Sequence, residues 1–231
     1  KLLNIMPETL KKYKYRIFFG FLLLFLIIQP LPLSKTAQYV VNQYLILTLA
    51  VSPYLLTGSR KALILSFLAA FYVLLCDYIF QYDPASVERM ISGIIALLII
   101  VGLILYVLYH VIHYEIVSED LIYSGLSGFF LLAIAFSLIF EECQVFRLIT
   151  FEANGQKEII LNSQEMLYFS LSCLSTLGIG DIIPSTLIGK RLAVLESSIG
   201  ALYVAVFIGR LVALCVSISQ NTRKDSNFHA K

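Results

Sequence analysis

The chemically most distinctive part of the sequence is residues 176–181, which read TLGIGD. Gly178 and Gly180 can adopt positive φ angles, so an extended strand there can turn consecutive peptide carbonyls toward one side. Oxygens arranged in this way, together with the Thr176 hydroxyl, are suited to replace the water around a cation. One strand cannot enclose an ion, whereas four copies around an axis would build stacked rings of oxygens. At the end of the strand, a ring of Asp181 carboxylates would concentrate cations.

A short helix is expected directly before this strand. In the sequence NSQE, Asn162 can cap a helix and Glu165 can complete a capping box. Residues 166–175 are apolar and suit a helix, but they are too few for the roughly 20 residues that cross a bilayer. A short helix followed by a Gly-rich strand predicts a re-entrant loop, which is stable at membrane depth only inside protein or beside a water-filled cavity. The C-terminal carbonyl dipoles of the helix would favour a cation.

The composition indicates that lipid surrounds most of the chain. The 231 residues are 59% hydrophobic and 14% charged, with a mean hydropathy of +0.85. Soluble domains are roughly 45–50% apolar and about 25% charged, so an ordinary soluble enzyme and a disordered chain are excluded. A net charge of +2 is too small for a nucleic-acid-binding protein. The four cysteines have no metal-ligand spacing and the three histidines no catalytic partner, so we expect neither enzyme activity nor a cofactor.

Six apolar segments are long enough to be membrane-spanning helices. They are residues 15–33, 39–56, 62–80, 90–109, 121–140 and 192–217. The expected fold is an all-α polytopic membrane protein with six transmembrane helices and a re-entrant helix and loop between the fifth and the sixth. A secretory signal is the alternative interpretation of the first segment, because basic residues precede it, but no cleavage site of small residues follows.

The distribution of Lys and Arg favours cytoplasmic N- and C-termini. With the N-terminus inside, most of the basic residues lie on the cytoplasmic side, and most of the others lie in one long outer segment where the rule is weak. We divide the chain into an N-terminal four-helix membrane segment (1–117), a domain that holds the re-entrant loop (118–217) and a short cytoplasmic tail (218–231). Such a tail is too short for a folded ligand-binding domain.

The sequence STLGIGDIIP resembles the selectivity filter of the potassium-channel family, whose pattern is T-[VLI]-G-[YF]-G-D. Pro184, Gly189 and Arg191 also fall where pore domains of this family often place them. Gly200 falls at the hinge of the family's inner helix. The resemblance covers about residues 121–217, and it is specific because the motif lies between two spans and follows a capped half-helix.

This resemblance implies the six-helix, tetrameric branch of the potassium-channel family. It implies four peripheral helices, then helix, pore helix, selectivity-filter loop and helix, assembled as a homotetramer among the lipids of the plasma membrane. The implied function is passive conduction of K⁺, which is the permeant ion rather than a cofactor, and no nucleic acid is involved. The implied filter residues, of which the first four hold K⁺, are Thr176, Leu177, Gly178, Ile179 and Gly180, with Asp181 at the outer mouth.

Two features depart from the family pattern. Ile179 replaces the usual aromatic residue, so a hydroxyl that could hold the filter to neighbouring helices is missing. The fourth span, residues 90–109, has no Lys or Arg, whereas a voltage sensor needs several charges worth about 2.3 kcal/mol each per 100 mV. We therefore expect a channel without a voltage sensor. A nonselective monovalent cation channel is the alternative, and a secondary transporter is a further one, although transporters typically repeat their motifs.

Further candidate residues lie in the last span. Gly200 is either a gating hinge or a glycine that lets two helices pack closely. If it is a hinge, the expected pore lining is Ala201, Val204 and Ile208, which lie at helical spacing. An ionisable residue within a span usually faces a partner or a cavity. Glu196 is therefore either a regulatory carboxylate behind the filter or a structural buried acid.

For Glu196 we favour the structural role, with a serine as the hydrogen-bond partner. The candidate partners are Ser197, Ser198 or a hydroxyl of the short helix, such as Ser172 or Ser175. Arg210, near the inner end of the last span, is expected to extend to lipid phosphates rather than to line the cytoplasmic mouth. The long segment between the fifth and sixth spans is rich in Glu and Asp, and it forms either an acidic outer vestibule or a solvated turret.

Overall fold

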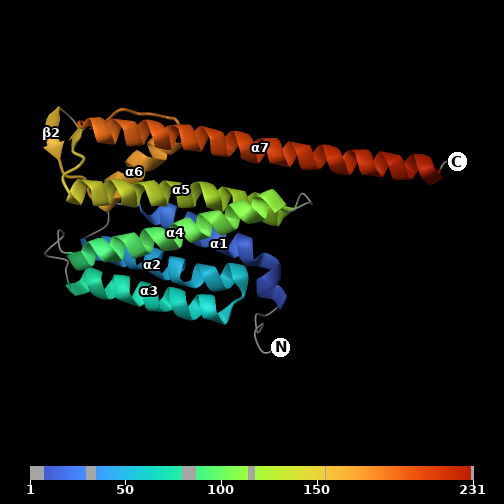
Figure 1. Cartoon of the computed structure of the whole chain (residues 1–231), viewed down its shortest axis with the longest axis horizontal. Helices are drawn as coiled ribbons and strands as arrows, with labels where there is room; N and C mark the ends of the chain where they lie inside the picture. Colours follow the sequence, from blue (N-terminus) through green and yellow to red (C-terminus); the bar gives the residue numbers. More distant parts are fainter. Residues whose placement is uncertain (1–7, 30–34, 80–86, 114–117, 154, 230–231) are drawn as a thin grey trace.

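The computed structural model describes residues 8–29, 35–79, 87–113, 118–153 and 155–229. Within these ranges the chain forms seven helices and one small three-stranded sheet. The helices are α1 (Glu8–Ile28), α2 (Lys35–Thr57), α3 (Arg60–Ile79), α4 (Val87–His113), α5 (Glu119–Val145), α6 (Ser163–Leu174) and α7 (Leu187–His229). The strands are β1 (Phe151–Ala153), β2 (Gln156–Ile159) and β3 (Ile182–Pro184). Figure 1 shows α1 to α5 packed as a bundle, with the short α6 between α5 and α7.

Four helices among the described residues are long and apolar enough to cross a membrane. Their apolar parts are Val40–Thr57, Met90–His113, Glu119–Val145 and Leu187–Val216, whereas the apolar stretch of α3 is shorter. The six segments predicted as spans all lie on helices, namely α1 to α5 and α7. Four of the six therefore meet the requirements for a span, and a membrane crossing by α1 and α3 stays a prediction.

Some predicted boundaries cannot be compared with the structure. The predicted ends of the first and third spans (30–33 and 80), the domain boundary at residue 117, and residues 1–7 and 230–231 lie outside the described residues. The apolar part of α7 ends at Val216, next to the predicted end of the last span at residue 217. The helix itself continues to His229.

The chain is helical as predicted, and a small sheet that the sequence did not predict is added to it. β1 and β2 pair in antiparallel fashion between α5 and α6, and β3 follows residues 176–181 and pairs with β1, which gives the order β2-β1-β3. Phe151 of β1 is completely buried. Its ring centroid lies 6.2 Å from that of Phe140 in α5 and 5.3 Å from that of Phe169 in α6, and the latter two centroids are 5.1 Å apart. This aromatic cluster fixes the sheet, and with it the end of the strand that follows Asp181, against α5 and α6.

One face of α1 joins the bundle. Phe18, Leu22 and Phe25 are at most 2% exposed, and their spacing of three and four residues places them on one face of the helix. This face packs toward α5, while α2 lies beside it. At the end of α2, the Leu56 carbonyl accepts a hydrogen bond from Lys14 Nζ of α1 at 2.8 Å. The positive charge suits the C-terminal end of a helix, where carbonyls lack partners.

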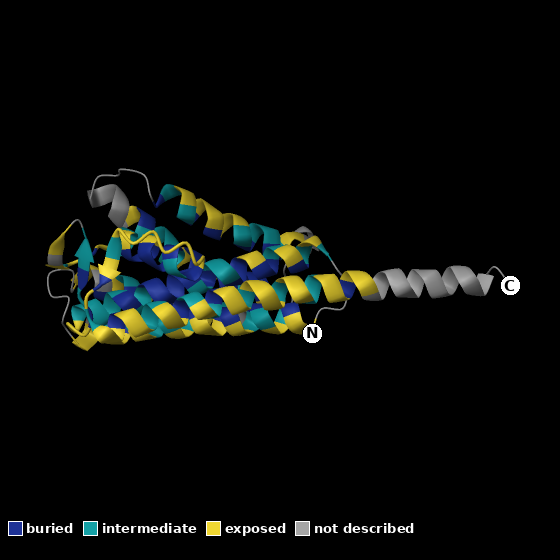
Figure 2. Cartoon of the chain, turned by 90° about the horizontal axis from the view of Figure 1, so that it is seen from above, coloured by how far each residue is buried: buried dark blue, intermediate teal, exposed yellow. Residues whose placement is uncertain are grey.

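α7 is the least covered of the apolar helices. In the most apolar stretch of α7, within Leu187–Val216, 11% of the residues are buried. The corresponding share in α5 is 56%. Figure 2 shows exposed residues along much of α7 where it runs beside the bundle. Where α7 passes the end of α6, a Cβ on Gly200 would collide with the Leu174 carbonyl oxygen. Gly200 is thus a close-packing glycine in this structure, and its role as a gating hinge stays a prediction.

Replacing Gly200 with alanine is expected to destabilise the packing of α7 on α6. The added methyl group would overlap a backbone oxygen that cannot rotate away, and overpacking of this kind costs about 1–3 kcal/mol. Gly102→Ala is the matched control, because Gly102 also lies inside a helix and no atom lies within 4 Å of its Cβ position. Thermal unfolding in detergent should give a lower midpoint for Gly200→Ala than for Gly102→Ala. Equal midpoints would contradict the close packing.

Candidate functional site

The short helix that precedes the Gly-rich strand begins at the predicted cap. Asn162 Oδ1 accepts hydrogen bonds from the backbone N–H groups of Gln164 and Glu165, both at 3.0 Å. Glu165 Oε2 accepts the N–H of Asn162 at 2.8 Å, which completes the capping box. The predicted capping box is therefore confirmed. It fixes the start of α6, and α6 in turn sets where the following strand begins.

After the last turn of α6, the chain folds back against the helix. The N–H of Thr176 donates to the Cys173 carbonyl at 2.9 Å, and that of Gly178 donates to the Ser172 carbonyl at 3.1 Å. The N–H of Ile179 donates to the Ser172 hydroxyl oxygen at 3.2 Å. Ser172 alone therefore accepts two consecutive N–H groups of the strand, one on its carbonyl and one on its side chain.

These two hydrogen bonds fix the direction of two consecutive carbonyls. The described peptides are all trans, and in a trans peptide the C=O points opposite to the N–H. The N–H groups of Gly178 and Ile179 both point toward Ser172. The carbonyls of the same two peptides, those of Leu177 and Gly178, therefore point away from α6 on one side of the chain. In a regular β-strand, consecutive carbonyls point to opposite sides.

Along the strand, residues with positive φ alternate with residues that do not have positive φ. Thr176, Gly178 and Gly180 have φ angles of 60°, 56° and 81°. Leu177 and Ile179, between them, do not have positive φ. The prediction of positive φ at the two glycines is confirmed, whereas no sequence signal indicated it for Thr176. A β-branched residue with positive φ is a genuine outlier, and such strain is kept only where the surrounding structure imposes it.

Asp181, at the end of the strand, is held from two sides. The Tyr168 hydroxyl of α6 donates to Asp181 Oδ2 at 2.7 Å, and the N–H of Ile182 donates to Oδ1 at 3.0 Å. The bond to Asp181 raises the pKa of the Tyr168 phenol. Tyr168 was not among the predicted site residues, although a hydroxyl within an apolar helix is a signal that could have marked it. It supplies a hydroxyl contact of the kind that Ile179 cannot make.

The side of the strand that faces away from α6 is uncovered in the described chain. All residues from 175 to 181 are exposed. Leu177 is 72% exposed and Ile179 is 59% exposed, although both side chains are apolar. Non-helical backbone at membrane depth requires protein or a water-filled cavity around it. One copy of the chain supplies such surroundings on the α6 side only.

Glu196 of α7 is buried on the opposite side of α6, with 0% exposure. Its Oε1 lies 2.5 Å from the hydroxyl oxygen of Ser170 in α6, which also lies 2.7 Å from the Ala133 carbonyl oxygen in α5. The structure shows a buried acid with a serine partner, as predicted. The partner is Ser170, a hydroxyl of the predicted short helix, and not one of the four serines named as examples. The cause is the rotation of α6 about its axis, which directs Ser172 toward the strand instead.

The hydrogen bonds around Ser170 favour a neutral Glu196. A serine hydroxyl has one proton, and the Ala133 carbonyl can only accept. When Ser170 donates to Ala133, its contact with Glu196 is a hydrogen bond only if the carboxyl group is protonated and donates to Ser170. A charged carboxylate without solvent exposure would also be costly, and Glu196 Oε2 has no hydrogen-bond partner. Glu196 thus joins α7 to α6 and α5 through Ser170, and its structural rather than regulatory role stays a prediction.

The predicted pore-lining residues lie on an uncovered face of α7. Ala201 is exposed, Val204 is 42% exposed and Ile208 is 53% exposed. Their spacing places them along one side of the helix. Because the described chain leaves this side open, it is available to a cavity, and the pore-lining role stays a prediction.

Arg210 contacts another helix. Its Nη2 donates to the Ile112 carbonyl of α4 at 2.8 Å, and its extension to lipid phosphates stays a prediction. Ile112 lies in the last turn of α4, where carbonyls lack partners within the helix and a positive charge is favoured. The contact joins the last peripheral helix to α7, at the end of α7 farther from residues 176–181.

Ser170→Ala is expected to lower thermal stability, because it leaves the buried Glu196 carboxyl without its partner at a cost of about 1–3 kcal/mol. Glu196→Gln should keep the wild-type midpoint, because an amide can donate to Ser170 as a protonated carboxyl does. Ser198→Ala is the matched control, since the exposed Ser198 hydroxyl bonds only to the Val194 carbonyl of its own helix at 2.8 Å. Unfolding midpoints in detergent test this order. A loss in Glu196→Gln as large as in Ser170→Ala would refute the neutral acid.

Comparison with known proteins concerns the same segment. Residues 128–217 match a family model described as "Ion channel". The match begins within α5 and includes α6, residues 176–181 and the apolar part of α7. No match was found among the curated proteins. Residues 128–217 are therefore similar to an ion-channel domain, which supports passive ion-channel activity. The apolar helices fit an integral membrane protein.

Proposed function

We propose that the chain is a passive K⁺-selective channel that works as a homotetramer in the plasma membrane, with both termini in the cytoplasm. The observation that carries the proposal is the direction of the Leu177 and Gly178 carbonyls, which point together away from α6. A row of peptide oxygens that faces one way can replace the hydration shell of an alkali cation. The ion-channel domain supports the same class of function.

In this proposal the residues of the strand have distinct roles. The ligands of dehydrated K⁺ are the carbonyl oxygens of Thr176, Leu177, Gly178 and Ile179, together with the Thr176 hydroxyl. Ions in adjacent sites displace one another, so that tight binding does not prevent passage. Gly180 allows the strand to leave the ion path, and the Asp181 carboxylate concentrates cations at the outer mouth.

The surfaces that stay exposed in a single copy of the chain support the tetramer. One strand can surround an ion on one side only, and four strands around an axis would close the ring. The exposed carbonyl side of the strand and the sparsely buried α7 are the surfaces that partner copies would cover. Covering them would give the strand the protein and water surroundings that non-helical backbone requires at membrane depth.

The proposed channel is not opened by voltage acting on α4. No Lys or Arg occurs in Met90–His113, so this helix offers no gating charge. The peripheral helices nevertheless contact α5 and α7 near one end of the bundle. Arg16 of α1 pairs with Glu119 of α5, and Arg210 of α7 binds the Ile112 carbonyl of α4. In this proposal a movement of the peripheral helices reaches α7 through these contacts.

Gly178→Ala is expected to abolish K⁺ current, at least tenfold below wild type, while leaving the tetramer intact. Gly178 has a φ of 56°, which costs a non-glycine residue roughly 1–2 kcal/mol, and relief of this strain would turn a carbonyl away from the axis. Gly155→Ala is the matched control, because Gly155 has a φ of 75° outside the filter and no atom near its Cβ position.

The measurement is single-channel recording in planar bilayers, combined with native mass spectrometry of the protein. The expected mass is four times the 26.0 kDa of one chain for the wild type and both variants. Unchanged current in Gly178→Ala would place the conduction path elsewhere. Saturating flux without single-channel steps would indicate a carrier, and a monomeric mass would remove the proposed pore.

Selectivity for K⁺ over Na⁺ is expected despite Ile179, because Ser172 holds the middle of the strand and Tyr168 holds its end at Asp181. In mixed K⁺ and Na⁺ solutions, the reversal potential should lie close to that of K⁺. Tyr168→Phe removes the bond to Asp181 and should move the reversal potential toward that of Na⁺. Tyr78→Phe, on an exposed tyrosine of α3, is the control and should have no effect. A wild-type reversal potential midway between the two ions would favour the nonselective cation channel.

A further inference from the structure

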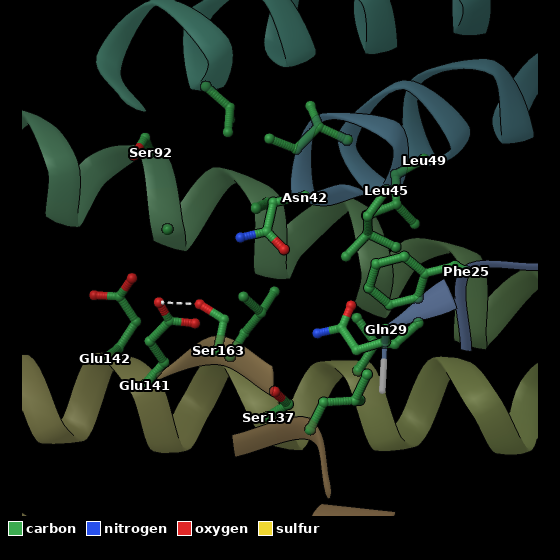
Figure 3. A pocket seen from close by; sticks show the side chains of 17 residues that line it. Phe25, Gln29, Asn42, Leu45, Leu49, Ser92, Ser137, Glu141, Glu142 and Ser163 are labelled. Carbon is green, nitrogen blue, oxygen red and sulfur yellow. Dashed lines mark hydrogen bonds between the residues drawn. The ribbon is translucent and has the colours of Figure 1, made fainter. Parts of the chain in front are cut away.

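A cavity of about 160 Å³ lies between the peripheral helices and the helices α5 and α6. Residues of α1 to α6 line it, together with Gln29, which directly follows α1. The described residues 176–181 are not part of its lining. One wall is apolar and includes Phe25, Leu45 and Leu49, which Figure 3 shows on one side of the cavity. This wall suits a small hydrocarbon group.

The backbone of Gln29 is fixed by two hydrogen bonds. Its N–H donates to the Phe25 carbonyl at 3.0 Å, which continues the last turn of α1. Its carbonyl accepts a hydrogen bond from Nε2 of Gln164 in α6 at 2.6 Å. Gln29 therefore joins α1 to α6, and these contacts set the position from which its side chain extends.

The side chain of Gln29 supplies an observation that points to a ligand. The residue is 5% exposed, and its Oε1 is buried without a hydrogen-bond partner in the part of the chain that the structure describes. Figure 3 shows the Gln29 amide directed into the cavity, toward the side where Asn42 and Ser163 lie. A buried acceptor without a donor is costly. A bound molecule that donates one hydrogen bond to this oxygen would therefore be stabilised.

The acidic side chains of the cavity favour a neutral molecule. Glu141 and Glu142 of α5 lie opposite the apolar wall (Figure 3). Both already interact with other residues of the chain, and Glu141 Oε1 accepts the hydroxyl of Ser163 at 3.0 Å. Because their interactions are made within the chain, the two carboxylates do not require a cation. Their negative charge in turn disfavours an anion.

We propose that this cavity binds a small neutral molecule with one hydroxyl group on a hydrocarbon body, such as a phenol or a short alcohol. The hydroxyl donates to Gln29 Oε1, and the hydrocarbon body lies against Phe25 and Leu49. An apolar lining with a few placed polar groups is typical of sites for small molecules. The site lies off the proposed ion path and does not depend on K⁺ selectivity.

Phenol is a suitable probe because of its size and charge. A cavity of about 150 Å³ holds one benzene molecule, whereas sites for drug-sized molecules are about 300–1,000 Å³. The phenol hydroxyl is neutral at pH 7, as the tyrosine hydroxyl is. Toluene has nearly the same shape as phenol but no hydrogen-bond donor, so it serves as the counterpart.

Binding is tested by isothermal titration of the full chain in detergent with phenol and with toluene, after subtraction of the heat in protein-free detergent. We expect wild type to bind phenol at least fivefold more tightly than toluene, because only phenol donates to Gln29 Oε1. Gln29→Met keeps an unbranched side chain without the amide, and it should bind the two compounds equally. Gln156→Met, on an exposed glutamine of β2, is the matched control and should distinguish the compounds as wild type does.

A second substitution tests the cavity independently of Gln29. Ala96→Leu fills the space from α4 and should abolish binding of both compounds. Ala62→Leu, on α3 and outside the cavity, is its control and should bind both as wild type does. Unfolding midpoints in the same detergent show whether each variant folds.

The proposal is overturned if wild type binds neither compound, or if it binds both equally, as expected for a site in which water already donates to Gln29. It is also overturned if Gln29→Met still prefers phenol fivefold, or if Ala96→Leu binds phenol as wild type does.

Discussion

A non-helical backbone at membrane depth must have its N–H groups bonded inside the protein. The strand of residues 176–181 depends on how α6 accepts its N–H groups. Ser172 accepts the N–H groups of Gly178 and Ile179, one on its carbonyl and one on its hydroxyl. Because these donors are used toward α6, the carbonyls of the same peptides remain for the other side. A pore requires this asymmetry, with donors satisfied by protein and acceptors left for the ion. The helix must also end before the strand begins, so a longer α6 would remove the site.

α5 is the element that places α6 and α7 relative to each other. Its Ala133 carbonyl faces the Ser170 hydroxyl of α6 at 2.7 Å, and its Gly125 carbonyl accepts the Tyr203 hydroxyl of α7 at 2.5 Å. Gly125 also leaves room for the ring of Phe207, which a Cβ would displace. Both contacts use carbonyls of a helix, and a serine or tyrosine hydroxyl can reach them without breaking the helix. Burial of more than half of the α5 span follows from this central position.

Local features of the fold could be predicted from the sequence, and features set by packing could not. The capping box of α6 and the positive φ of the two strand glycines depend on neighbouring residues alone. The contacts of Ser170 with Glu196 and of Tyr168 with Asp181 depend on the rotation of α6 about its axis, which packing against α5 decides. The positive φ of Thr176 has no sequence signal, because threonine ordinarily avoids it. The sheet was missed because strands of three or four residues with an irregular register show no readable alternation.

The contacts of α7 also bear on where this helix can bend. Three of them, at Glu196, Gly200 and Tyr203, hold its first half to α6 and α5. A bend at Gly200 would move Tyr203 away from α5 and break the bond between them. A bend at Gly209 would leave all three contacts in place, and no atom lies within 4 Å of its Cβ position. Arg210, the next residue, binds α4. The ring of Phe207 also packs against α5. The first half of α7 is thus held behind the strand, and its freedom to bend begins after Phe207, beside the contact with the peripheral helices.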